Sequence, residues 1–342
     1  MGYRAVVTYH VEEHGGRVAP AVFAELFEQV ALADALGFEA LWLAEHHFGV
    51  HQSYAAQPLL LALAAALRTR RIAVGTSLIV LPLHHPLAVA EQLATLDALT
   101  GGRLSIGFGS GSAPAEFAGF GLELTSEERY GRFRESLEVL ELAWRGEPFR
   151  YDGAFFQIPE TRLVPRPSRP LRDIAWLGAM SPPTATLAGA LGYGLQLPRG
   201  RAPADYAPVL DAYRAARRER GHPPGEERVA IARCVYVGAD DATALAEAAP
   251  SVAAFYRQSQ RLAPDAPVPP PLEMIEELRF VVGGPERCAR EIAALGAATG
   301  MTHLSVQPTW QGLDPALATA SLRRFGEAVL PAVERGSVER GA

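Results

Sequence analysis

Short apolar runs alternate with longer amphipathic segments along almost the whole chain, and this alternation constrains its fold more than any other feature. The short runs are rich in β-branched residues, as buried strands are, whereas the longer segments place apolar residues at helical spacing. Eight strands are predicted, at residues 4–9, 39–44, 72–80, 104–107, 174–177, 194–197, 228–237 and 302–306. Eight strand–helix pairs indicate an α/β chain that closes into a (β/α)₈ TIM barrel, with an open doubly wound sheet as the structural alternative.

Two stretches depart from the alternation. In residues 148–170, Asp152-Gly153 lies between aromatic residues and predicts a hairpin with a two-residue turn. Residues 238–284 follow the seventh strand and contain the run LAPDAPVPPP, which breaks regular structure. We interpret this segment as an insertion between strand seven and the last helices, suited to act as a lid. Residues 1–342 show no domain boundary, so a single domain is expected.

Length and composition exclude several classes of protein. With 342 residues, the chain exceeds the roughly 250 of a minimal α/β barrel. Its net charge of −6 includes no block of Lys or Arg, which gives no electrostatic reason to bind nucleic acid or an anionic membrane. The N-terminus has no basic region followed by an apolar one, and the longest apolar run, residues 58–67, is half a membrane span. Only two cysteines occur, and neither has a cysteine neighbour at metal-ligand spacing. We therefore expect a soluble, cytoplasmic protein whose cysteines are reduced.

Unusual polar and glycine residues follow the predicted strands. In a barrel of this class, the active site is built just past the C-terminal ends of the strands. The residues in question are Glu45-His46-His47-Phe48 after strand two, Gly75-Thr76-Ser77 in strand three, Gly107–Ser112 after strand four, Gly178–Ser181 after strand five and Gln307 after strand eight. Their common placement predicts one shared site at that end of the barrel.

The histidines of the first cluster point to proton transfer rather than to a metal. Adjacent residues on an extended segment face opposite sides, so His46 and His47 do not easily bind one ion, and no metal ligand is predicted. A titratable imidazole at a barrel mouth is suited to moving protons near pH 7, which is the role predicted for His46. His47 is expected to pack under the barrel rim, and the pair His84-His85 to serve in capping and loop packing.

The glycine-rich run after strand four is a candidate phosphate site. Loops of this kind expose backbone N–H groups that can hold a phosphate. The glycines have a second explanation, because tight turns also require glycine. GFGSGS (residues 107–112) matches neither a Walker loop nor the dinucleotide fingerprint. Ser181 and Thr184 begin a predicted helix, and their hydroxyls either bind the same anion or cap the helix.

Several long stretches together resemble the bacterial luciferase-like flavin monooxygenases. LGFEALWLAEHHF (Leu36–Phe48) and Val74–Gly111 carry the resemblance most specifically, and Gly283–Ile292 and Ala115–Trp144 add to it over nearly the whole chain. The resemblance implies a (β/α)₈ barrel, often a homodimer, that binds reduced FMN supplied by a separate flavin reductase. It further implies that O₂ adds to the flavin, and that the resulting flavin hydroperoxide oxidises an organic substrate.

The resemblance also assigns roles to individual residues. His46 occupies the position of the family's catalytic histidine, an acid and base, and Glu45 would orient the segment that carries it. The Ser77–Leu78 bond matches a non-proline cis peptide beneath the flavin ring. The residues that the resemblance implies for cofactor binding are Ser77, Leu78, Gly109, Ser110, Gly111, Met180 (through its backbone), Ser181 and Thr184.

One position departs from the family pattern. Luciferase α-type chains have an arginine where this chain has Ser110, so a fork of charged donors toward the phosphate is replaced by a single hydroxyl. Arg199 and Arg201, after strand six, are the candidates to replace that arginine. The change also leaves room for a deazaflavin, a cofactor used elsewhere in the wider superfamily.

The leading hypothesis from the sequence is an FMN-dependent monooxygenase. Four aromatic residues lie near predicted strand ends: Phe48, Phe108, Trp176 and Trp310. They suggest an apolar organic substrate. The alternatives are a deazaflavin-dependent dehydrogenase on the same barrel and a non-catalytic flavin-binding protein, and the intact Glu45-His46-His47 counts against the second of these.

Overall fold

The main sheet of the molecule is a closed ring of parallel strands. The computed structural model describes residues 3–11, 18–49 and 53–338. In ring order the strands are β1 (Arg4–Tyr9), β2 (Ala40–Leu43), β3 (Ala73–Val80), β4 (Leu104–Gly109), β7 (Ala175–Gly178), β8 (Gly194–Leu197), β9 (Val229–Val237) and β11 (His303–Gln307). β11 pairs with β1, and β8 pairs with β9, so the ring is complete. The predicted (β/α)₈ barrel is confirmed, and the alternative of an open sheet is wrong.

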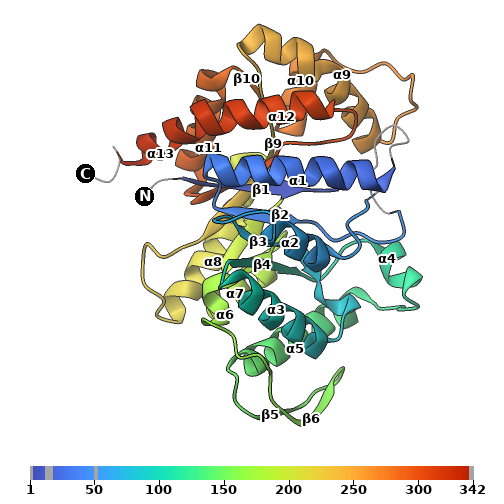
Figure 1. Ribbon diagram of the computed structural model, residues 1–342, viewed down its shortest axis with the longest axis vertical. Coiled ribbons are helices and arrows are strands. Elements are labelled where there is room, and N and C mark those ends of the chain that lie inside the picture. The colour runs from blue at the N-terminus through green and yellow to red at the C-terminus, as the bar shows by residue number, and fades with distance from the viewer. Residues whose placement is uncertain (1–2, 12–17, 50–52, 339–342) are drawn as a thin grey trace.

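Helices cover the outside of the ring (Figure 1). They are α1 (Ala19–Leu36), α2 (Pro58–Ala66), α3 (Pro86–Thr100), α5 (Ser126–Trp144), α6 (Leu171–Ile174), α7 (Pro182–Leu191), α8 (Ala207–Glu219), α11 (Pro285–Thr299), α12 (Pro315–Arg324) and α13 (Leu330–Val338), with short turns η2 (Leu81–Leu83), η3 (Pro203–Tyr206) and η4 (Phe325–Val329). α1 ends at Gly37, whose φ of 92° is a left-handed conformation that glycine adopts without steric penalty. Within the described ranges, every helix is too short or too polar to span a lipid bilayer.

Two tryptophans fill the lower part of the barrel interior. The rings of Trp42 and Trp176 pack edge to face with centroids 5.0 Å apart. Both indole N–H groups donate to the Ser105 hydroxyl, at 2.9 and 3.0 Å. The indole N–H groups are therefore satisfied, and the two tryptophans form a buried floor of the barrel interior together with Val6, Ala40 and Ala230.

Strand β3 is irregular where the sequence places Gly75-Thr76-Ser77. Its register with β4 shifts between Thr76 and Ile79. The Ser77–Leu78 peptide bond inside this bulge is cis, as the resemblance implies. The side chains of Ser77 and Leu78 are half-buried, whereas the rest of the upper strand is buried.

Glycines on two neighbouring strands make room for the bulge. A methyl group added at Gly107 or Gly109 would lie 2.8 or 2.7 Å from a Leu78 methyl carbon, and one at Gly178 would also collide with Leu78. Strand β4 continues to Gly109, so the prediction that it ends at Gly107 is wrong. The first two glycines of GFGSGS serve the close approach of Leu78 to the strand, and the loop begins at Ser110.

The segment 238–284 forms a separate layer beside the barrel, at the top of Figure 1. It contains α9 (Asp241–Ser259), α10 (Pro271–Leu278) and β10 (Val281–Gly283), which pairs in parallel with β9. Its apolar side chains pack with Trp310, which follows β11. The Trp310 indole N–H donates to Ser251 of α9 at 3.1 Å, so this layer is attached to a loop at the C-terminal end of the barrel.

The predicted hairpin is present, but its turn is longer than expected. Strands β5 (Phe149–Asp152) and β6 (Gln157–Thr161) are antiparallel, and Asp152 pairs with Gln157. Asp152-Gly153 is therefore not a two-residue turn, and residues 153–156 form the loop. The Glu135 carboxylate of α5 accepts the backbone N–H groups of residues 154–156, at 2.8, 2.9 and 3.2 Å. This long-range partner stabilises a loop that the local sequence does not specify.

Candidate active site

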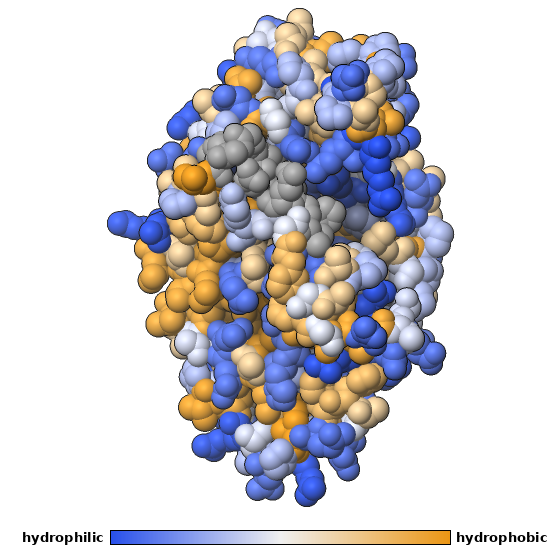
Figure 2. Space-filling model, turned by 90° about the vertical axis from the view of Figure 1, so that its right-hand side faces the viewer, coloured by the Kyte–Doolittle hydropathy of each residue, from blue (hydrophilic) through white to orange (hydrophobic). Residues whose placement is uncertain are grey.

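Two of the chain segments predicted to share a site, the one after β2 and the connection after β4, meet at the C-terminal end of the barrel. His46 follows β2, and Glu116 lies in α4 (Pro114–Gly119), a short helix in the connection after β4. The His46 Nδ1 atom is 3.1 Å from Glu116 Oε1, which also accepts the backbone N–H of His47 at 3.0 Å. Figure 2 faces this end of the molecule and shows a hollow, walled mostly by hydrophilic residues, beside the atoms drawn in grey. His46 is therefore bonded to the connection that follows Gly107–Ser112, through Glu116 rather than through the glycine-rich run itself.

Glu116 is a functional candidate that sequence reasoning missed. Its side chain is buried, which by itself would raise the pKa of the carboxyl group. Hydrogen bonds from His46 and from the His47 N–H outweigh this effect and lower the pKa of Glu116 below its usual value. An ionised Glu116 accepts the Nδ1–H of His46. The neutral imidazole then carries its lone pair on Nε2, which is the atom able to take up a proton.

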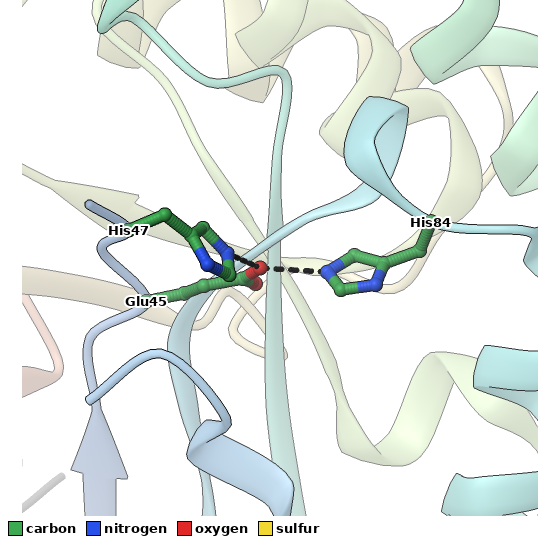
Figure 3. Close-up of side chains that lie close together, drawn as sticks. All are labelled: Glu45, His47 and His84. Carbon is green, nitrogen blue, oxygen red and sulfur yellow. Dashed lines mark hydrogen bonds and ion pairs between the residues drawn. The ribbon is translucent and has the colours of Figure 1, made fainter. Parts of the chain in front are cut away.

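Glu45 connects two other histidines rather than the ring of His46 (Figure 3). Its Oε1 atom is 2.7 Å from His47 Nε2 and 2.6 Å from His84 Nε2. Its Oε2 atom accepts the backbone N–H of Val80 at 2.8 Å. Burial opposes ionisation, but these hydrogen bonds lower the pKa of Glu45 to about 2. Glu45 therefore holds the start of the His46 segment against β3, which is consistent with the orienting role that the resemblance implies.

The same three side chains must be considered as a metal site. Glu45, His47 and His84 each offer one ligand atom, and these atoms lie within 4.8 Å of one another. Both histidine nitrogens approach a single oxygen, Glu45 Oε1, at hydrogen-bond distances (Figure 3). Two N–H donors on one carboxylate oxygen account for this geometry, whereas metal ligation requires lone pairs that point to a common centre. His47 is thus buried in a hydrogen-bond network, as its packing role predicts.

A second histidine lies beside His46, and the sequence analysis did not identify it. The His10 ring, at the end of β1, stacks on the His46 ring with centroids 5.7 Å apart and an interplanar angle of 20°. Its Nε2 is 3.2 Å from the Nε2 amide nitrogen of Gln307, whose Oε1 accepts the Cys234 thiol at 3.4 Å. A lone histidine after the first strand carries no motif, so only the closure of the ring brings it to the site.

Three of the four aromatic residues proposed to line an apolar mouth are core residues. Phe108 belongs to the main core between sheet and helices, Trp176 to the barrel floor, and Trp310 to the core of the segment 238–284. Only Phe48 of the four is exposed, at 62%. The expectation of an aromatic mouth is therefore wrong, because side chains alternate across a strand and nearness to its end does not fix the face.

The N-terminus of α7 lies on the same rim. Ser181 is the N-cap residue, but its side chain makes no capping hydrogen bond, and Thr184 is half-buried in the first turn. The preceding residue, Met180, is exposed, and its carbonyl oxygen is 3.5 Å from Nη1 of Arg201. Arg199, in contrast, stacks over Phe255 of α9 at 4.7 Å. Of the two arginines proposed to replace the family arginine, only Arg201 reaches this helix end.

A further arginine lies near the loop that begins at Ser110. The guanidinium of Arg129, in α5, lies 5.8 Å from the ring centre of Phe117. A methyl group added at Gly111 would lie 2.9 Å from the same ring. The Arg129 Nε atom is buried and has no hydrogen-bond partner among the described residues. Sequence reasoning missed Arg129 because it is one of many charged residues on an amphipathic helix.

The chain is similar to known monooxygenases and F420-dependent dehydrogenases. The profile described as luciferase-like monooxygenase matches residues 5–303. The chain is 38% identical over 161 residues to 4-hydroxyprotoasukamycin monooxygenase of Streptomyces nodosus subsp. asukaensis, covering 46% of this chain and 43% of that protein. It is 34% identical over 193 residues to the F420-dependent glucose-6-phosphate dehydrogenase of Beutenbergia cavernae, covering 54% and 56%. The chain thus spans about half the length of these curated relatives.

A solved structure covers much more of the chain. The monooxygenase RslO1 from Streptomyces bottropensis is 25% identical and superposes with a TM-score of 0.85, over 96% of this chain and 99% of that one. Similar proteins therefore include both monooxygenases and F420-dependent dehydrogenases.

Proposed function

The chain belongs to the luciferase-like monooxygenase family of oxidoreductases, and we propose that it is an FMN-dependent monooxygenase acting on a small organic substrate. One observation carries the proposal: the imidazole of His46 lies at the barrel mouth with its Nδ1 bonded to an ionised, buried carboxylate, Glu116. Such a pair fixes the tautomer and orientation of a proton-transferring group. Reduced FMN, when bound, supplies the electrons that activate O₂.

The residues at the start of α7 and near Ser110 fit the phosphate of a flavin mononucleotide. The ten-residue helix α7 begins with Pro182 and Pro183, which lack N–H groups, so the hydroxyl of Ser181, which is not used for capping, and that of Thr184 would be its donors to an anion. Arg201 beside Met180 and Arg129 beside Phe117 supply the positive charge that Ser110 does not. Ser181, Thr184 and these two arginines would hold the phosphate, with backbone N–H groups of Ser110 and Gly111 as further donors.

The chain's own residues then have separate tasks. His46 accepts or gives a proton at Nε2, while Glu116 holds the orientation of the ring through Nδ1. Glu45, through His47 and the Val80 N–H, keeps the loop after β2 against β3. The floor of Trp42 and Trp176 excludes water from below. We further propose that a separate flavin reductase delivers the reduced FMN, as the family resemblance implies.

A deazaflavin-dependent dehydrogenase is the second candidate, and two observations favour it. Ser110 stands where luciferase α-type chains have a phosphate-binding arginine, and F420-dependent dehydrogenases are among the chain's relatives. His46 and Glu116 would serve equally well in moving the proton of an alcohol during hydride transfer.

Anaerobic titration decides between the two cofactors. The purified chain is titrated separately with reduced FMN and with reduced deazaflavin F420, and binding is followed by the change in flavin absorbance and fluorescence. The FMN proposal predicts that reduced FMN binds at least about tenfold more tightly. Tighter binding of the deazaflavin, with no measurable affinity for reduced FMN, would replace the proposal by the dehydrogenase. If the chain binds neither reduced FMN nor reduced F420, both proposed functions are ruled out.

A further inference from the structure

A buried amide in the barrel interior has no partner. Gln196, in β8, is only 7% exposed, and neither its Oε1 nor its Nε2 atom has a hydrogen-bond partner among the described residues. Its two strand neighbours, Leu195 and Leu197, belong to the core outside the sheet, so the alternation of a strand turns Gln196 toward the barrel axis. A buried amide that forms no hydrogen bond destabilises the folded protein, which calls for a functional explanation.

The amide lies beside the β3 bulge. A methyl group added at Gly107 would lie 2.8 Å from Gln196 Oε1 and 2.8 Å from a Leu78 methyl carbon. Gln196 therefore reaches across β7 toward β4 and ends next to the Leu78 side chain. The bulge is the part of the barrel where the resemblance places the flavin ring.

The other interior polar groups near the mouth are already paired. Thr8 and Ser305 bond each other through their hydroxyls at 2.7 Å. The amide of Gln307 uses its oxygen for Cys234 and its nitrogen for His10. Among these described interior side chains, Gln196 alone offers both an unused acceptor and unused donors.

A primary amide presents an acceptor and a donor side by side in one plane. The matching group on a ligand is a cyclic imide, in which an N–H lies next to a carbonyl oxygen. We propose that Gln196 binds the imide edge of the flavin ring, with Oε1 accepting the imide N–H and Nε2 donating to the adjacent carbonyl. This inference rests on the proposed flavin function and adds a residue that fixes the orientation of the ring.

The test compares FMN with FMN methylated at the imide nitrogen, which removes the donor that Gln196 is proposed to bind. Dissociation constants are measured by fluorescence titration for the wild type, for Gln196→Met and for the control Gln29→Met, whose buried amide donates to Thr319 between α1 and α12, outside the barrel. In the wild type and in the control, methylation should weaken binding at least about tenfold. In Gln196→Met, FMN itself should bind about tenfold more weakly, and methylation should change its affinity less than about threefold.

Stability supplies a second readout that a purely structural role would not produce. Removing an unpartnered amide should raise the melting temperature of ligand-free Gln196→Met by a few degrees, although the same substitution weakens flavin binding. A methylation penalty as large in Gln196→Met as in the wild type would overturn the inference, and so would unchanged FMN affinity. Either result leaves the FMN proposal intact, whereas a wild type that binds no flavin overturns both.

Discussion

Two carboxylates position the histidines of the mouth by separate hydrogen bonds. Glu116 bonds the ring of His46 and the backbone of His47, while Glu45 bonds the rings of His47 and His84. Both carboxyl groups have lowered pKa values because N–H donors surround them despite burial. The ionised Glu116 carboxylate thus contacts the imidazole that is proposed to move a proton, and it fixes the orientation of that ring.

Replacing Glu45 by Gln should destabilise the protein in a pH-dependent manner. Folding lowers the pKa of Glu45 from 4.5 to about 2, so its stabilisation is complete above pH 4.5 and is lost as the pH falls toward 2. We expect Glu45→Gln to lower the free energy of unfolding by about 2–3 kcal/mol at pH 7, and by clearly less at pH 3. Urea unfolding of both proteins at the two pH values measures this. An equal difference at both pH values would contradict the account.

The sequence predicts some site residues and necessarily misses others. Glu45 and His46 are identifiable because their residue types and their place after a strand both indicate chemistry. Glu116 and His10 are single residues without a motif, and each becomes meaningful only when a distant segment lies against it. Gln196 is also invisible in the sequence, because an unpartnered amide is a property of the packed barrel interior.

At the level of elements, the loops after β7 and β8 form the proposed phosphate site. The hydroxyl of Ser181 and the guanidinium of Arg201 both lie at the start of α7. Local sequence does not determine this placement, because Arg199, only two residues before Arg201, packs on Phe255 of α9 instead. It depends on how the loops lie in the closed barrel.

Substituting these two arginines tests the phosphate site with a matched pair. Arg201→Ala should weaken FMN binding about 10- to 100-fold, because it removes a charged donor to the phosphate. It should leave the affinity for riboflavin, which has no phosphate, nearly unchanged. Arg199→Ala removes the same side chain from the same loop and should alter neither affinity more than about twofold. Fluorescence titration with both ligands measures the four values. Equal losses for FMN and riboflavin in Arg201→Ala would refute the assignment.

Strand and helix positions follow well from sequence periodicity, and the exceptions have identifiable causes. All eight barrel strands were predicted, because β-branched runs between helical segments have few other solutions. The prediction of a two-residue hairpin turn is wrong because Glu135, in α5, stabilises a longer loop. The predicted end of β4 at Gly107 is wrong because glycine is typical of turns, whereas Gly107 and Gly109 accommodate Leu78 within the strand. α4 and β10 are too short to give a periodic signal.

At the scale of the whole molecule, two neighbouring helices, α2 and α3, leave apolar surface uncovered. Leu60 in α2 is 66% exposed, Leu67 at its end 73%, and Leu99 in α3 60%. Figure 2 also shows hydrophobic residues gathered along one side of the barrel-mouth view. A helix that is apolar on its outer face is normally buried by a partner. We therefore expect the homodimer that the family resemblance implies to form over α2.

Light scattering coupled to size exclusion tests this expectation. The wild type should elute as a dimer, and the double variant Leu60→Glu, Leu67→Glu as a folded monomer, because two buried charges would disrupt the interface. Leu272→Glu, at an exposed leucine of α10, serves as the control and should remain dimeric. A monomeric wild type, or a dimeric double variant, would show that α2 is not the interface.

The central claim is that the mouth holds reduced FMN while His46 controls its reaction with O₂. The most direct measurement mixes anaerobic protein–reduced FMN complex with oxygenated buffer and follows hydrogen peroxide release. The account predicts that wild-type protein slows this release at least about tenfold relative to free reduced FMN. His46→Ala should bind reduced FMN with an affinity within about threefold of the wild type, yet lose most of the delay. Peroxide release as fast as from free reduced FMN, or a His46→Ala variant indistinguishable from the wild type, would contradict it.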